Sequence, residues 1–419
     1  MNKHCKNIAY ICVLFIYNVL FGVIYQFLIL FFLFRLYRKK ETLSSLYQKL
    51  CPNFPLLFFK TRRFDIWFHA ASVGELRSMD FLISNNINAR HQVLITTTTL
   101  KSAEIVNAYD SKYVTHSFLP IDFLPLHLAF FWKNRAKKII IADSEIWLTF
   151  FAVSSIFCVK IFLFNARMSH ASRKKWEYVP HIFYSTLKSI AVILPQGRSE
   201  LNFFSKFHNN VLYYGNLKMI NLKFECKNLN EKIIQFPQKK VIAVVSTHDG
   251  EDALIIEQIV HFKEKFDIIY CPRHPHRAVD ISKILLKYDI ENSILSQNSA
   301  RKSCLIVDSI GLLDSVFSVA DVAIYGGSFL PHLKGHNIME PASFGCKIIT
   351  GNFVETFIEV IDEMKNHNAI IQCDACDLQN MVKTVMSGGK NQAIGMNAKK
   401  YIENNMPNIP QILEKLEEI

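Results

Sequence analysis

A single carboxylate, Glu75, has the sequence setting most typical of acid–base chemistry in this chain. The apolar run 66–68 ends at His69, and small residues lead through Gly74 to Glu75. This pattern predicts a strand, a tight turn and a helix over 76–83. Glu75 would then lie at the carboxyl edge of a sheet, where open α/β sheets bind ligands. Acids also favour the first turn of any helix, so a purely structural role stays open from this stretch alone.

Residues suited to binding a nucleotide occur in the C-terminal half. The stretch Gly326, Gly327 and Ser328 has little side-chain bulk, so its backbone N–H groups can approach a phosphate, although paired glycines are also ordinary turn residues. Arg273 can clamp a phosphate or carboxylate with its planar fork, or it can be a solvated loop arginine.

A third motif, Asn337 to Glu340, precedes a predicted helix. The Glu340 carboxylate can hold a ribose diol, as acidic residues do in dinucleotide sites. Alternatively, Asn337 caps the helix and Glu340 is its first-turn acid.

The elements that must position these residues alternate between strand and helix, which predicts parallel sheets with crossover helices. We expect one series of strands at 66–68, 93–97, 114–119, 138–142, 160–164 and 190–194. We expect a second series at 241–245, 266–270, 304–307, 322–325, 347–349 and 369–371. The fold class is therefore α/β, with two Rossmann-like parallel-sheet domains. Polar clusters follow nearly every strand, which favours an enzyme with ligand groups on both walls of a cleft, although each cluster alone can be turn chemistry.

An almost continuous apolar segment, 8–34, precedes these domains and contains no charged residue. It exceeds the roughly 20 residues that a membrane helix needs. Arg35, Arg38, Lys39 and Lys40 follow it, so the positive-inside rule predicts a single-pass anchor with the body in the cytoplasm. The expected parts are the anchor (1–38), a basic linker (39–63), an acceptor-side domain (64–216), an interdomain linker (217–238), a nucleotide domain (239–390) and a C-terminal helical segment (391–419).

Composition narrows the range of partners. The chain has 419 residues, is half hydrophobic and carries a formal net charge of +12, which suits a phosphorylated lipid or an anionic membrane surface. No nucleic-acid-binding module is recognisable, so we expect no nucleic-acid partner. The ten cysteines are scattered, and the one CxxC pair, Cys373 and Cys376, lacks companion ligands, so we expect no metal site.

These motifs together resemble the 3-deoxy-D-manno-octulosonic acid (Kdo) transferases of lipopolysaccharide synthesis. The similarity covers most of the chain after the anchor and keeps the family's order. It runs through 67–75, 96–99, 119–122, 144–147, 165–169, 215–218, 246–250, 272–277 and 326–341.

The resemblance implies the two-domain GT-B glycosyltransferase architecture, at the bacterial inner membrane. The donor would be CMP-Kdo, the acceptor a lipid A precursor, the reaction inverting, and no cofactor or metal would be needed. Glu75 would be the general base, while Glu145 and Arg167 would line the cleft. The residues expected to contact CMP are Pro272, Arg273, Ile310, Gly311, Leu312, Asn337, Ile338, Met339 and Glu340.

The chain departs from the family pattern at three positions. Lys334 precedes Gly335 where a second glycine is usual, and Leu312 and Asp143 stand where glutamates are usual. Two other functions stay open at this point. One is a different nucleotide-sugar-dependent transferase or epimerase on the same architecture, and the other is a non-catalytic membrane-bound scaffold.

Overall fold

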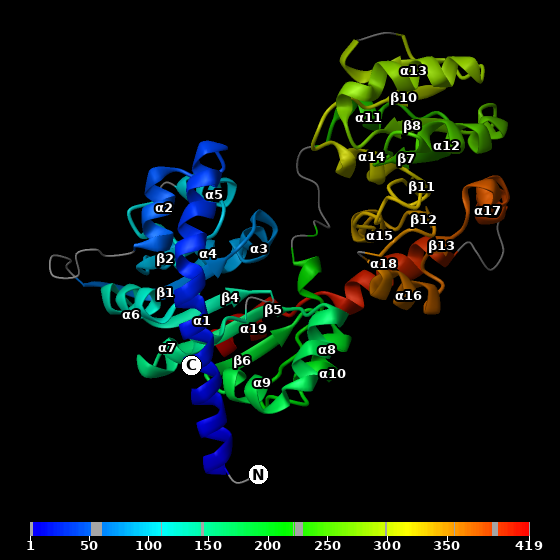
Figure 1. Ribbon diagram of the computed structural model, residues 1–419. Coiled ribbons are helices and arrows are strands. Elements are labelled where there is room, and N and C mark those ends of the chain that lie inside the picture. The colour runs from blue at the N-terminus through cyan, green and yellow to red at the C-terminus, as the bar shows by residue number, and fades with distance from the viewer. Residues whose placement is uncertain are drawn as a thin grey trace. The chain divides into compact units, whose positions relative to one another are not determined.

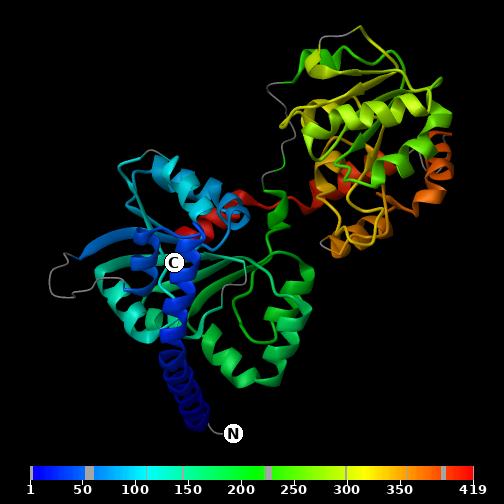
Figure 2. The same cartoon turned by 45° about the horizontal axis from the view of Figure 1, so that its top comes forward.

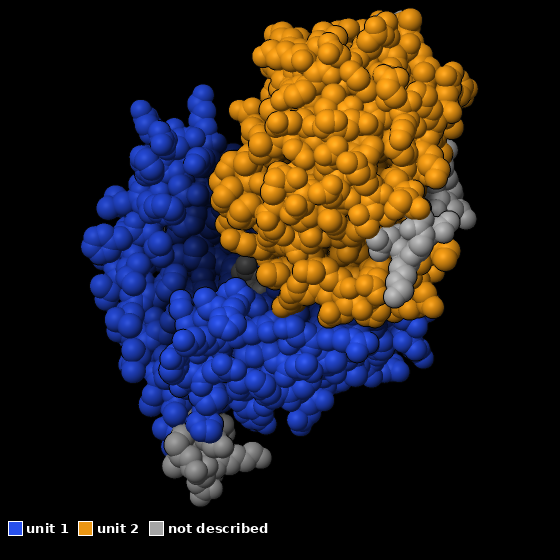
Figure 3. Space-filling view, turned by 90° about the vertical axis from the view of Figure 1, so that its right-hand side faces the viewer, with its two compact units in different colours: residues 1–220, 407–419 blue, residues 221–406 orange. Residues whose placement is uncertain are grey.

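The chain folds into two compact units, shown in a computed structural model. Unit 1 comprises residues 1–220 and 407–419, and unit 2 comprises residues 221–406 (Figures 1 and 3). The structure describes residues 3–51, 61–109, 111–143, 146–220, 222, 229–297, 300–355, 357–387 and 393–418, without the side chains of 3–7 and 218. Each unit is built on one parallel sheet, so the predicted α/β class with two parallel-sheet domains is confirmed.

The sheet of unit 1 has six strands in the order β3-β2-β1-β4-β5-β6. The strands are β1 (Arg62–Ala70), β2 (Val93–Thr97), β3 (Val114–Phe118), β4 (Asn134–Ala142), β5 (Lys160–Ala166) and β6 (Ile190–Pro195). Successive strands are added on one side of β1 up to β3 and then on its other side from β4. The strand order therefore reverses between β1 and β4, and such a switch point is where open α/β sheets bind ligands.

Helices of unit 1 cover both faces of its sheet, so the central strands are apolar on both sides. Trp67 packs into one core and its neighbours Ile66 and Phe68 into the other. The helices are α1 (Lys3–Tyr37), α2 (Leu43–Leu50), α3 (Val73–Ser78), α4 (Asp80–Asn88), α5 (Leu100–Asn107), α6 (Leu124–Lys133), α7 (Leu148–Ile156), α8 (His170–Tyr178), α9 (Pro180–Leu187), α10 (Arg198–Phe204) and α19 (Ile409–Glu417).

Unit 2 has a seven-stranded sheet in the order β13-β12-β11-β7-β8-β10-β9, with its switch point between β7 and β11. The strands are β7 (Val241–Val245), β8 (Asp267–Cys271), β9 (Asn292–Ile294), β10 (Cys304–Ile306), β11 (Val322–Tyr325), β12 (Lys347–Thr350) and β13 (Ile371–Gln372). The helices are α11 (Glu231–Ile234), α12 (Glu251–Ile259), α13 (Ala278–Lys287), α14 (Leu313–Val319), α15 (Met339–Ser343), α16 (Ile358–Asn366), α17 (Leu378–Met386) and α18 (Ile394–Asn405).

Three details of the elements differ from, or add to, what the sequence predicts. The helix expected over 76–83 is two helices, α3 and α4, that meet at Met79. The short strand β9 was not predicted, because its three residues carry too little pattern. The expected linker 39–63 contains the folded helix α2, which Thr42 and Ser45 begin with a capping box.

The C-terminal segment does not stay in one piece. Helix α18 belongs to unit 2, whereas α19 belongs to unit 1 (Figure 2). Ile412 and Leu416 of α19 are buried in the core of unit 1. Asn408 N–H donates to the Tyr214 carbonyl at 2.7 Å, which fixes the start of this helix. The amphipathic pattern predicted the helix, but only the contacts assign it to unit 1.

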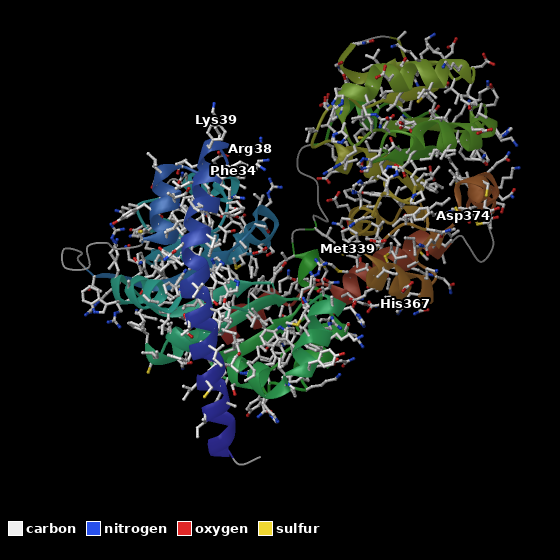
Figure 4. All side chains as sticks on the ribbon, in the orientation of Figure 1. Phe34, Arg38, Lys39, Met339, His367 and Asp374 are labelled. Carbon is white, nitrogen blue, oxygen red and sulfur yellow. The ribbon has the colours of Figure 1, made fainter. Side chains whose placement is uncertain are left out.

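Helix α1 is the one described helix that is long and apolar enough to cross a membrane. One of its faces nevertheless packs against unit 1. Asn18 donates to Thr149 Oγ1 (3.2 Å) and accepts from Leu124 N–H (2.8 Å). Just past the C-terminal end of the helix, Arg38 lies over the Phe34 ring at 5.5 Å, where the apolar stretch gives way to basic residues (Figure 4). The helix therefore combines a docked face with an apolar exposed face.

Candidate active site

The carboxylate of Glu75 lies at the switch point of unit 1, on the first turn of α3 directly after β1. Ser72 caps this helix, accepting from Glu75 N–H at 3.3 Å. The side chain of Glu75 turns back, so that Oε2 accepts from Ala71 N–H (2.6 Å) and Oε1 from the Ser72 hydroxyl (2.8 Å). Glu75 therefore takes part in the hydrogen bonds that begin α3. Each carboxylate oxygen has a second lone pair that can accept a substrate proton.

A buried network lies beneath this turn. Trp67 Nε1–H donates to Thr96 Oγ1 at 2.7 Å, and His69 Nδ1 lies 2.9 Å from the same oxygen. Burial lowers the pKa of His69 to about 3, so its ring is neutral at physiological pH. The ring also packs edge-on against Trp147, with centroids 5.4 Å apart. His69 therefore supports the end of β1 as part of the core.

Some of the other polar residues at the edge of this sheet are hydrogen-bonded within the fold, and others are exposed. The Asp122 carboxylate accepts from Thr149 N–H (3.3 Å) and Phe150 N–H (3.0 Å), so it caps α7. Asp143 accepts from Asn165 Nδ2 at 2.5 Å. Arg167 follows β5 with an exposed side chain. Glu145 lies outside the described residues.

The structure corrects the expected role of the glycine turn in unit 2. Gly326 N–H donates to the Val245 carbonyl in the sheet. The N–H groups of Gly327 (2.7 Å) and Ser328 (3.0 Å) donate to the carboxylate of Glu251, which is fully buried. These backbone groups are therefore already satisfied within the protein, so the expectation that they hold a phosphate is wrong.

The two glycines are needed for a different reason. A Cβ at Gly326 would lie 2.7 Å from Thr247 Cα, so this position allows the end of β11 to approach the end of β7. Gly327 has φ +75°, and a Cβ there would overlap the His336 ring. Glycine thus allows His336 to pack onto the turn, where its Nε2 lies 2.8 Å from His248 Nε2.

An arginine and a glutamate interact electrostatically at one edge of unit 2. Arg273 follows β8 with an exposed side chain, and its N–H donates to the Thr247 carbonyl at 3.1 Å. Burial raises the pKa of Glu340, Asp314 raises it further, and Arg273 opposes both. Arg273 also acts on His336, whose pKa burial lowers to about 4. Arg273 and Glu340, predicted from separate motifs, are therefore electrostatic neighbours.

The remaining expected CMP contacts differ in exposure. Ile310 is 89% exposed, and Gly311 (φ +85°) has open space where a Cβ would be, so this turn is accessible to a ligand. Leu312 is partly buried at the N-cap of α14.

The motif before α15 and the turn after β8 are less accessible. Asn337 Oδ1 accepts from Met339 N–H at 3.1 Å, a local turn bond made one residue before the N-cap, Ile338. Ile338 and Met339 are buried, so their side chains serve the core, and Pro272 is also buried.

Two features of this edge escaped the sequence analysis. Glu251 follows Thr247-His248-Asp249-Gly250, and the sequence does show an acid after a glycine at a helix start. It does not show which four N–H groups that carboxylate binds. The His248–His336 pair joins residues from two distant motifs. Among the residues that the structure describes, no group of His, Cys, Asp or Glu is arranged to hold a metal ion.

Comparison with known proteins identifies the family. The family described as 3-deoxy-D-manno-octulosonic-acid transferase (kdotransferase) matches residues 36–221. A 3-deoxy-D-manno-octulosonic acid transferase of Rickettsia prowazekii is 31% identical over 359 residues, covering 82% of this chain and 77% of the relative. The chain belongs to the Kdo transferase family. It is therefore a glycosyltransferase.

Two further similarities agree with this assignment. A probable 3-deoxy-D-manno-octulosonic acid transferase, mitochondrial, of Arabidopsis thaliana is 31% identical over 327 residues, covering 73% of this chain and 72% of the relative. The solved structure of the spinosyn rhamnosyltransferase SpnG with its aglycone shares the fold, with a TM-score of 0.53 at 9% identity over 84% of this chain and all of that one. The two-domain glycosyltransferase architecture is thus the observed one.

Proposed function

We propose that this transferase moves Kdo from CMP-Kdo to a lipid A precursor, with inversion at the anomeric carbon and Glu75 as general base. Glu75 takes the proton of the acceptor hydroxyl as that oxygen attacks the anomeric carbon. CMP leaves as a phosphate monoester, and Arg273 stabilises the charge that develops on it. The proposal needs no metal ion, so activity should persist in EDTA.

The geometry of Glu75 is the observation that carries the proposed base. Its carboxylate is anchored by Ala71 N–H and the Ser72 hydroxyl at the switch point of unit 1. These bonds fix the carboxyl group in one orientation, and its remaining lone pairs can accept a proton. A general base must be within hydrogen-bond reach of the proton it removes, and a preset orientation lowers the cost of reaching that arrangement.

The donor assignment rests on exposed and half-buried groups at one edge of unit 2. Arg273 is an exposed cation after β8, and it interacts electrostatically with Glu340. We assign the phosphate of CMP to Arg273, the ribose diol to Glu340, and the base to backbone groups of the accessible turn Ile310 to Leu312. Leu312 offers no side-chain acceptor, so backbone groups must provide that contact.

The position of the enzyme follows from α1 and its basic flank. Arg35, Arg38, Lys39 and Lys40 end or follow the apolar helix. Each such residue adds about 1 kcal/mol of attraction to an anionic leaflet. We place the body at the cytoplasmic face of the bacterial inner membrane, where a phosphorylated glycolipid acceptor would be available.

The decisive experiment is incubation of the full chain with CMP-Kdo and a lipid A precursor, followed by mass spectrometry. Mass steps of Kdo residues are expected. Glu75→Gln should lower the transfer rate by about 10²–10⁴-fold, the usual contribution of a general base, with CMP affinity unchanged. Glu104→Gln, at an exposed glutamate of α5, is the matched control. Near-normal transfer by Glu75→Gln would remove Glu75 from this role.

A further inference from the structure

An apolar pocket in unit 1 lies between the C-terminal part of α1 and the carboxyl ends of β2, β3 and β4. Its volume is about 290 Å³, near the lower end of the roughly 300–1,000 Å³ that small-molecule sites occupy. Most of its wall is aromatic or aliphatic. The apolar lining residues are Phe31, Phe32, Leu119, Pro120, Ile121 and Trp147.

The polar groups of the pocket are already paired. Lys49 Nζ donates to both oxygens of Glu41 and to the Thr98 carbonyl, each at 2.8 Å. An ammonium group has three hydrogens, so each has an acceptor. Arg35 pairs with the same Glu41 at 3.1 Å. Lys49 is thus fully engaged within the protein, and the apolar part of the wall favours a hydrocarbon ligand.

The wall of the pocket is continuous with the apolar outer surface of α1. Phe31 lines the pocket and is itself 51% exposed, and the neighbouring Leu30 and Phe34 are also exposed. A helix with this composition presents its exposed side chains to lipid when it lies in or against a membrane. An alkyl chain can then pass from the lipid phase into the pocket along apolar surface only.

The pocket is also next to the carboxylate of Glu75. Thr98 lines the pocket, and its hydroxyl donates to the Ala71 carbonyl at 2.6 Å. The N–H of the same Ala71 donates to Glu75 Oε2 at 2.6 Å. On the other side Trp147 lines the pocket and packs against His69 at the end of β1. Two hydrogen bonds thus separate an apolar cavity from the proposed base.

We infer that this pocket binds one acyl chain of the glycolipid acceptor while the acceptor hydroxyl lies at Glu75. The inference rests on the proposed function, since it assumes an acylated acceptor. Each buried methylene contributes about 0.8 kcal/mol, so even a short stretch of chain can orient the sugar at the carboxyl edge of the sheet. The acyl chain is then a determinant of acceptor specificity, recognised by the anchor helix and the catalytic domain together.

Filling the pocket tests the inference. Ile121→Trp narrows it, and Ile24→Trp makes the same replacement on the exposed surface of α1, away from the pocket. Two acceptors are compared: the acylated lipid A precursor and its fully deacylated, water-soluble counterpart. Ile121→Trp should raise the KM for the acylated acceptor at least tenfold and change transfer to the deacylated one less than twofold. Ile24→Trp should change neither. Equal effects of Ile121→Trp on both acceptors, or no effect, would overturn the inference.

A binding measurement separates the pocket from the reaction. A precursor analogue with brominated acyl chains should quench the fluorescence of Trp147, and Trp147→Phe should abolish that part of the quenching. The same quenching in Trp147→Phe and in the wild type would exclude chain binding here. If the analogue quenches the fluorescence of the wild-type protein, but the protein transfers Kdo to neither acceptor, the proposed function fails and the pocket assignment stands.

Discussion

Replacing Glu251 by glutamine should loosen the turn after β11 while leaving the sheet of unit 2 intact. The carboxylate accepts four backbone N–H groups, from His248 (2.9 Å), Gly327 (2.7 Å), Ser328 (3.0 Å) and Phe329 (2.9 Å). Two of these bonds go to each carboxylate oxygen. Glutamine keeps one acceptor oxygen and puts an NH₂ group where the other was, so two N–H groups lose their acceptor.

The magnitude follows from that count. A buried donor left without a partner costs about 1–3 kcal/mol, so two such donors cost about 2–6 kcal/mol in the stability of this turn. Since 1.4 kcal/mol is a factor of ten, hydrogen exchange of the amides of Gly327 to Phe329 should accelerate by about 30-fold to 10⁴-fold. Hydrogen exchange with mass spectrometry of the peptide that contains them measures this directly.

A matched control lies on the same helix. Glu257 is an exposed glutamate of α12, so Glu257→Gln should change stability by less than about 0.5 kcal/mol. The reasoning is refuted if the peptide keeps wild-type protection in Glu251→Gln, because another acceptor must then serve these N–H groups. Loss of CMP affinity in Glu251→Gln would show in addition that the turn supports the donor site.

Three further predictions concern other parts of the chain. Arg273→Gln should weaken CMP binding about tenfold to a hundredfold in calorimetry, because a charge-assisted hydrogen bond contributes about 1.5–3 kcal/mol; an unchanged Kd would exclude Arg273 from the phosphate site. His69 has its pKa lowered by burial to about 3, so the unfolded state takes up its proton first and the free energy of unfolding falls as pH drops below about 6.5. Between pH 6.5 and 5 the free energy of unfolding should fall by about 2 kcal/mol in the wild type, and urea titrations of His69→Asn should show a smaller fall. An identical pH dependence in the two proteins would contradict the lowered pKa of His69. The double variant Ile412→Ala and Leu416→Ala should destabilise unit 1 by about 4 kcal/mol or more in unfolding monitored by tryptophan fluorescence. Unchanged stability would show that α19 does not pack on unit 1 in solution.

The sheet and its edge were predictable because their signals are local. The strands 93–97, 241–245 and 322–325 were predicted with the bounds that the structure has. An apolar run of that length between turn residues is characteristic of a buried parallel strand. Glu75 was placed correctly at the end of β1, because strand, turn and helix follow one another within the sequence.

Parts of the candidate site were not predictable in this way. The glycine turn was predicted to bind a phosphate because nothing in its own sequence indicates an acceptor for its backbone N–H groups. The acceptor, Glu251, lies 76 residues away from Gly327 in the sequence and becomes its neighbour only when β7 and β11 pair. The side chains of Ile338 and Met339 belong to the core rather than to the surface, which a short motif cannot reveal.

The amino-acid order alone was enough to predict the α/β class, the parallel strands and an acid at the start of the helix after β1. Periodicity and helix capping act over a few residues, so the amino-acid order is sufficient for them. The folded chain was needed to show which groups satisfy the buried N–H donors, where α19 packs, and that α1 forms one wall of a pocket beside Glu75. These outcomes depend on contacts between distant segments, and such contacts arise only when the whole core forms.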